Sequence, residues 1–269
     1  MTLFDALILG IVEGITEYLP VSSTGHLLLT ERVLGIERSA AADAYAICIQ
    51  AGAIVAVLGL YRARIGQVLR GLAGKDAAGW RLFQNLVVAF LPAAVLGFLF
   101  NDAIDDLLFG LWPIVTAWTV GGVAILLIGR RHGGRELESL DLRTAFFIGC
   151  AQCLALWPGT SRSLATILGA SLLGLSVPAA VEFSFLLGLE TLGAATAYSA
   201  LKHGGEMVDA FGPAPIIVGF VASFVSATIS VKWLVGWLQS RGMGIFAVWR
   251  IGLAAIVAAL LLAGRLPAG

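Results

Sequence analysis

Charged residues are scarce in this chain of 269 residues. Asp, Glu, Lys and Arg make up 13% of it, whereas a soluble domain has roughly 25%. A basic excess is also missing, because 17 Lys and Arg balance 17 Asp and Glu. The shortage of charge excludes a surface that faces mostly water, and the balance argues against nucleic acid as a partner. Hydrophobic residues predominate instead, at 59% of the chain and a mean hydropathy of +0.93.

Cysteine is rare as well. The three residues, Cys48, Cys150 and Cys153, all lie in apolar runs. Cys150 and Cys153 form a C-x-x-C pattern, which in a cytosolic fold is typical of a redox motif. Reactive thiols need electropositive surroundings, which these runs do not supply. We therefore interpret the cysteines as small residues that pack between helices.

Six apolar segments are long enough to cross a bilayer, which takes about 20 helical residues. They cover residues 43–61, 82–100, 111–129, 178–200, 213–238 and 244–264. Two further apolar stretches, 3–34 and 144–175, are interrupted by Pro, Gly and hydroxyl residues. Each half has only about 12–16 residues, too few to cross. A break at membrane depth must be buried in protein or line a wet cavity, so each stretch is predicted to be a re-entrant helical hairpin.

The two broken stretches resemble each other. Gly10-x-x-Glu13 matches Gly149-x-x-Gln152, and residues 20–24 match 158–162 with a shift of one residue. Three spanning segments follow each stretch, and an odd number of crossings turns the second copy upside down. The sequence predicts an all-α integral membrane protein with about six transmembrane helices plus two re-entrant helical hairpins. It would be a single membrane domain, 1–269, in which 1–129 and 144–265 form an inverted-topology repeat.

Basic residues in the loops predict the orientation, because cytoplasmic loops are enriched in Lys and Arg. The loops near 62–81, 130–143 and 239–243 hold Arg62, Arg64, Arg70, Lys75, Arg81, Arg130, Arg131, Arg135, Arg143 and Arg241. The opposite side holds Arg32, Arg38, Lys202 and Arg265. The richer side is predicted to be cytoplasmic, so the first hairpin would open outward and the second would enter from the cytoplasm.

The first hairpin holds Glu13 and Glu17 shortly before its break. Their i,i+4 spacing places both carboxylates on one helix face, where they repel each other. A bridging divalent cation removes the repulsion, and a pair of carboxylates suits Mg²⁺ or Ca²⁺. The alternative is a helix end in the headgroup region, with both carboxylates solvated.

A hydroxyl cluster, Ser22, Ser23 and Thr24, follows the break in the first hairpin, and His26 lies two residues further on. The second half-helix begins there, and a helix N-terminus binds anions. The simpler interpretation is an N-cap, which explains one hydroxyl and not three. His26 has the chemistry of a general acid, a general base or a nucleophile, or it has a structural role.

The second hairpin carries Ser161-Arg162-Ser163 at the matching break. The planar fork of Arg donors fits phosphate oxygens. If the two breaks meet in the bilayer, the acidic pair, the hydroxyls, His26, Arg162 and two helix N-termini converge on one site. Such a set suits phosphoryl transfer, in which catalysis is mostly positioning and charge neutralisation. The other charges in or near the spans, Lys232, Arg250 and Glu190, are expected to snorkel or to pair with one another.

Residues 13–26, from Glu13 to His26, closely resemble the first signature of the undecaprenyl-pyrophosphate phosphatases of the bacitracin-resistance type. Residues 157–163 (Trp-Pro-Gly-Thr-Ser-Arg-Ser) resemble the second signature, at the expected separation. Two long motifs together are far more specific than one short pattern. The resemblance extends over nearly the whole chain.

The resemblance implies hydrolysis of a C55 polyprenyl diphosphate to the monophosphate carrier of cell-wall synthesis, in the bacterial plasma membrane. It also implies a divalent cation and a site reached from the periplasm. By matching position, Glu13 and Glu17 are the metal-binding acidic pair, with Glu17 and Arg162 catalytic. Either Ser23 or His26 is the nucleophile. The implied phosphate-binding residues are Ser22, Thr24, Gly159, Thr160, Ser161 and Ser163.

The sequence departs from the family pattern at Ala46, Leu164 and Glu190. These changes lie outside the phosphate-handling residues, so a relative that acts on another prenyl diphosphate is an alternative. A transporter or flippase of polyprenyl phosphate lipids is the alternative from another class, because inverted repeats with broken helices are typical of transporters. A purely structural membrane subunit explains neither Arg162 nor the acidic pair. The sequence leaves the oligomeric state open, a homodimer included.

Overall fold

The structure, a computed structural model, describes residues 1–129 and 133–266. Within these ranges, six helices are long and apolar enough to span a membrane, which confirms the predicted multi-pass membrane protein. They are α3 (Ala40–Leu60), α5 (Ala77–Leu108), α6 (Leu111–Ile128), α9 (Val177–Phe211), α10 (Pro213–Arg241) and α11 (Gly244–Leu262). Arg130 and Arg131, two of the charges expected in a cytoplasmic loop, lie outside the described residues.

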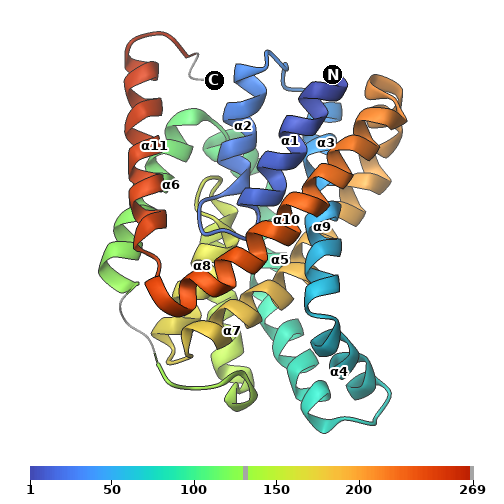
Figure 1. Ribbon diagram of the computed structural model, residues 1–269, viewed down its shortest axis with the longest axis vertical. Helices are drawn as coiled ribbons and strands as arrows, with labels where there is room; N and C mark the ends of the chain where they lie inside the picture. Colours follow the sequence, from blue (N-terminus) through green and yellow to red (C-terminus); the bar gives the residue numbers. More distant parts are fainter. Residues whose placement is uncertain (130–132, 267–269) are drawn as a thin grey trace.

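Both re-entrant hairpins are present. The first consists of α1 (Leu3–Thr16) and α2 (Ser23–Val33), and the second of α7 (Leu142–Gln152), a 3₁₀ turn η2 (Cys153–Leu156) and α8 (Arg162–Leu172). In Figure 1, α1 and α2 lie in the half of the molecule that holds the end of α11, whereas α7 lies in the half that holds α4 (Arg62–Leu72). Three spanning helices separate the hairpins, so the hairpins point toward each other from opposite ends.

The hairpins pack against the spanning helices in matching ways. A Cβ atom on Gly10 of α1 would collide with the carbonyl oxygen of Gly219 in α10, and one on Gly149 of α7 would collide with that of Ala89 in α5. Small residues at such contacts let helix backbones approach closely. The inverted repeat remains a prediction, and the matching positions of Gly10 and Gly149 support it.

The two half-helices that follow the breaks begin alike. Ser22 is the N-cap of α2 and Ser161 is the N-cap of α8. The number of residues from Ser22 to Ser161 equals the number from Gly10 to Gly149. A single alignment of the two hairpins, without a shift, therefore matches both the glycines and the caps. The shift of one residue expected between the breaks is therefore wrong, because the caps and not the prolines are equivalent.

Large apolar side chains cover much of the outer surface, as a bilayer requires. Phe98, Leu127 and Leu201 are at least 70% exposed, and in water such a surface would be an association site. Cys150 is exposed as well, so the expectation that it packs between helices is wrong. Cys48 and Cys153 are half-buried, in agreement with that expectation.

Candidate active site

The acidic and basic side chains of the two hairpin tips meet inside the molecule. Arg162 Nη2 lies 3.4 Å from Glu17 Oε1, and only 11% and 4% of these side chains are exposed. The other carboxylate oxygen, Glu17 Oε2, accepts a 2.6 Å hydrogen bond from Ser23 Oγ. The expected convergence of an acidic tip and a basic tip is confirmed.

Packing holds the Arg162 side chain in place. Its Nη1 donates to the carbonyl oxygen of Ser184 over 2.8 Å, and its guanidinium carbon lies 5.2 Å from the ring centroid of Tyr18. Gly188 leaves room for it, because a Cβ atom there would collide with the guanidinium. Among the described residues, Arg162 Nε has no hydrogen-bond partner. The guanidinium is therefore held in position, and its Nε donor is not used by the described residues.

The two half-helices both begin at a strained serine. Ser22 and Ser161 each have φ of 75°, and in 1–129 and 133–266 no other non-glycine residue has positive φ. Such a conformation costs roughly 1–3 kcal/mol and clusters at functional sites. Each Oγ accepts from a backbone N–H of the first turn, that of Gly25 or that of Leu164. The capping interpretation therefore holds for Ser22, and Ser161 caps α8 in the same way.

A central pocket lies between the two tips, with a volume of about 170 Å³. It is lined by Glu17, Ser22, Ser23, Thr24, Gln50, Ala155, Pro158, Gly159, Ser161, Arg162 and Leu192. The caps and first turns of α2 and α8 therefore face one cavity, and first-turn N–H groups have no carbonyl partner within their own helix. These N–H groups and the positive ends of the two helix dipoles make the pocket an anion site.

Sequence reasoning missed Gln50 of α3, which lines the central pocket. Its neighbours Ile49 and Ala53 are fully buried and apolar. The signal that could have found Gln50 is a lone amide within an apolar span, because polar groups at this depth face the protein interior.

Arg250 of α11 connects the two tips. It is fully buried and donates to the carbonyl oxygens of Pro20 (3.2 Å) and Gly159 (2.9 Å), one in each break. It also donates to the carbonyl oxygens of Ala117 and Trp118 in α6. The expectation that Arg250 snorkels or pairs with Glu190 is therefore wrong, because four backbone carbonyl oxygens, two of them in the irregular breaks, accept from its guanidinium.

Besides His26, three of the predicted site residues do not line the central pocket. Ser163 is fully buried and donates to the carbonyl oxygen of Leu19 over 3.0 Å, so it ties the second tip to the first. Thr160 belongs to the turn that Trp157 closes through a backbone hydrogen bond. Glu13 is fully buried, and neither of its carboxylate oxygens has a partner among the described residues. The alternative that Glu13 and Glu17 are solvated at a helix end is wrong.

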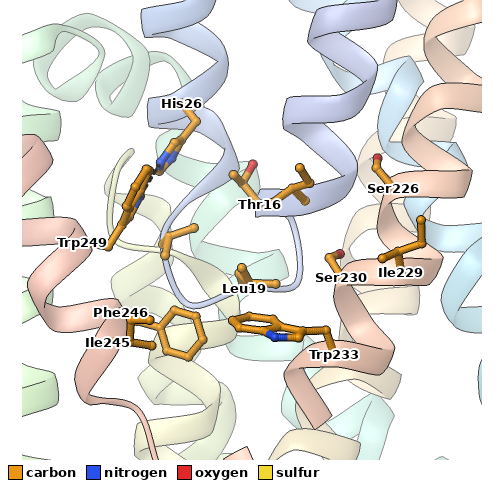
Figure 2. A pocket seen from close by; sticks show the side chains of 12 residues that line it. Thr16, Leu19, His26, Ser226, Ile229, Ser230, Trp233, Ile245, Phe246 and Trp249 are labelled. Carbon is orange, nitrogen blue, oxygen red and sulfur yellow. Dashed lines mark hydrogen bonds between the residues drawn. The ribbon is translucent and has the colours of Figure 1, made fainter. Parts of the chain in front are cut away.

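His26 faces a different cavity, as Figure 2 shows. Its Nδ1 lies 2.7 Å from the carbonyl oxygen of Ser22, and its Nε2 accepts a 2.9 Å hydrogen bond from Trp249 Nε1. The lateral cavity that it lines, about 470 Å³, lies between the first hairpin, α10 and α11. Ser23 Oγ, in contrast, bonds to Glu17. The structure therefore brings Ser23, Glu17 and Arg162 together and directs His26 elsewhere.

Comparison with known proteins gives consistent matches. A family model described as bacitracin resistance protein BacA matches residues 6–256. The chain is 45% identical to the undecaprenyl-diphosphatase of Sorangium cellulosum, over 94% of this chain and 85% of that protein. It is 45% identical to undecaprenyl-diphosphatase 1 of Chromobacterium violaceum, over 95% of each. It is 42% identical to the undecaprenyl-diphosphatase of Cereibacter sphaeroides, over 98% of each.

Replacing Arg250 by Met tests its role at the two breaks. The substitution removes this donor from the carbonyl oxygens of Pro20 and Gly159 in the two breaks, and each such loss costs about 1–3 kcal/mol. We expect the free energy of unfolding in mixed micelles to fall by about 3 kcal/mol or more. Arg70→Met is the matched control, because 59% of the Arg70 side chain is exposed. Equal stability of the two variants would contradict the assigned role.

Proposed function

The chain belongs to the bacitracin resistance protein BacA family, and on that basis we propose that it hydrolyses undecaprenyl diphosphate to undecaprenyl phosphate and inorganic phosphate. Relatives named undecaprenyl-diphosphatase match nearly its whole length. One observation in the structure supports the proposed hydrolysis. The hydroxyl of Ser23 is hydrogen-bonded to a buried carboxylate, Glu17, which is itself paired with Arg162.

The central pocket supplies positive potential for the diphosphate. Arg162 and the N-termini of α2 and α8 surround a cavity in which few groups are open to water. Fixed donors in such a site stabilise the charge that develops on the transferred phosphoryl group. Because Ser22 and Ser161 hold the two half-helices in their strained starting geometry, these donors are in place before the substrate binds.

Ser23 is the nucleophile in this proposal, and Glu17 is its base. The proton on Ser23 Oγ passes to Glu17 Oε2, 2.6 Å away, as Oγ attacks the terminal phosphorus. The bond between that phosphorus and the bridging oxygen breaks, and the lipid monophosphate leaves. Water then attacks the phosphoserine and the bond between phosphorus and Oγ breaks. Oγ takes the proton back from Glu17, and inorganic phosphate leaves with the oxygen and the protons of the water. His26 has a positioning role, since both ring nitrogens are engaged by Ser22 and Trp249.

Glu13 and Glu17 are the residues that would hold a divalent cation. The donor set fits, because the carboxylate of Glu13 is fully buried with no partner among the residues that the structure describes. An uncompensated buried carboxylate is unfavourable. Mg²⁺ typically takes one or two carboxylates and completes its shell with water and substrate phosphate. When bound, the cation supplies charge neutralisation at the diphosphate.

We place the enzyme in the bacterial plasma membrane, with its substrate drawn from the surrounding lipids. The end of the molecule that carries α4 holds Arg62, Arg64 and Arg70, and arginine-rich ends are cytoplasmic. The first hairpin enters from the opposite end, so the acidic tip is reached from the periplasmic side.

Purified protein in detergent is expected to release inorganic phosphate from undecaprenyl and farnesyl diphosphate. Glu17→Gln, Ser23→Ala and Arg162→Ala should each lower kcat by about 100-fold or more, because each removes a group that acts on the transferred phosphoryl. The matched controls are Glu206→Gln and Arg70→Ala, both on exposed side chains. A protein that binds these lipids and releases no phosphate would support the flippase alternative instead.

Chelation tests the cation. Treatment with excess EDTA should abolish phosphate release, and adding Mg²⁺ or Ca²⁺ back should restore it, because Glu13 and Glu17 would lose the cation that offsets their charge. Glu13→Gln should raise the concentration of divalent cation needed for half-maximal activity. Activity that persists in EDTA, with no dependence on added ions, would rule out the assigned cation.

A further inference from the structure

A second cavity adjoins the central pocket, between α5 and α9. Its volume is about 540 Å³, within the range of small-molecule sites. Ala155 and Arg162 line both this cavity and the central pocket. The second cavity, called here the α5–α9 groove, therefore begins at the guanidinium that would bind the diphosphate.

The groove leads away from Arg162 along one face of α9. Thr191, Ala194, Ala195, Tyr198 and Lys202 line it, and their spacing of three or four residues places them on one face of the helix. At 1.5 Å per residue, the wall from Thr191 to Lys202 is about 16 Å long. The α5 wall is formed by Phe90, Ala93, Ala94, Gly97 and Phe98.

The groove is polar at its inner end and apolar along its middle. Near Arg162 lies Gln152, which is 2% exposed and has no partner for either amide atom within the described part of the chain. A buried amide without a partner is unfavourable and indicates a missing polar ligand. Beyond it the walls consist mainly of Ala, Gly and Phe, until the α9 wall ends at Tyr198 and Lys202. At that end Phe98 of α5 is 86% exposed. The groove therefore has an apolar middle section, and its outer end opens toward lipid beside Phe98.

Resting on the phosphatase activity proposed above, we propose that the α5–α9 groove holds the first isoprene units of the substrate. The diphosphate lies at Arg162 and Gln152, and the chain runs between the small residues of α5 and α9 into the bilayer. A methyl-branched chain needs the width that alanine and glycine leave.

The lateral cavity is the competing place for the chain, because it is also apolar and lined by Trp233, Phe246 and Trp249. It has no lining residue in common with the central pocket. A chain there would have to pass the loop 17–22 of the first hairpin to reach Arg162. Continuity with the catalytic groups thus favours the α5–α9 groove.

Photolabelling tests the proposal directly and needs no turnover. A farnesyl diphosphate analogue with a diazirine on its chain is irradiated with the detergent-solubilised protein, and labelled peptides are identified by mass spectrometry. Label that unlabelled farnesyl diphosphate displaces is expected within residues 90–98 or 191–202. Displaceable label confined to 226–249 would place the chain in the lateral cavity and overturn the proposal.

Groove-filling variants provide a kinetic test. Ala94→Phe and Ala194→Phe should lower kcat/KM for farnesyl diphosphate by at least tenfold, mainly through KM. They should change kcat/KM for dimethylallyl diphosphate, with its single isoprene unit, less than twofold. Ala255→Phe, on the exposed side of α11, and Ile229→Trp, in the lateral cavity, should leave both substrates unaffected. Equal losses for both substrates, or a selective loss in Ile229→Trp alone, would overturn the proposal.

These experiments separate the two proposals. Displaceable label in the groove without phosphate release would support the proposed binding site and contradict the proposed activity. Phosphate release with label only at 226–249 would support the activity and contradict the α5–α9 groove as the site of the chain.

Discussion

Two interruptions of helical backbone inside a membrane are the constraint on which this structure depends. Carbonyl and N–H groups at that depth have no water to bind, so the protein must satisfy them. Arg250 does so for both breaks at once, because its guanidinium reaches Pro20 in one and Gly159 in the other. Ser163 adds a hydroxyl donor to the carbonyl of Leu19. The two tips are consequently joined to each other and to α6.

Once the carbonyl oxygens of the breaks are hydrogen-bonded within the protein, the N–H donors at the helix ends remain for a ligand. The N-termini of α2 and α8 line the central pocket, and Arg162 adds a full positive charge beside them. Glu17 offsets part of that charge and accepts the proton of the adjacent hydroxyl. One arrangement thereby supplies anion binding, a nucleophile and its base. A strained serine occurs at each break because each one orients one of the two helix ends.

The sequence predicts much of this architecture and fails where a contact depends on three-dimensional proximity. Length and hydropathy suffice for the six spans and both hairpins, and motif symmetry suffices for the meeting of Glu17 with Arg162. Nothing in the sequence distance between Arg250 and Pro20 indicates their contact, and a buried arginine was expected to find a carboxylate instead. The direction of His26 could not be predicted either, because one turn of helix decides whether it faces Ser23 or Trp249. Gln50 escaped notice because it lies outside both motifs.

The pairing of the two tips is the central claim, and a double-mutant cycle measures it most directly. Glu17→Gln, Arg162→Met and the double variant are compared by their free energies of unfolding in mixed micelles. Residues in direct contact give coupling energies of about 0.5–3 kcal/mol, whereas distant residues are additive within about 0.3–0.5 kcal/mol. The account predicts a coupling of about 1 kcal/mol or more. Additive effects of the two substitutions would contradict it.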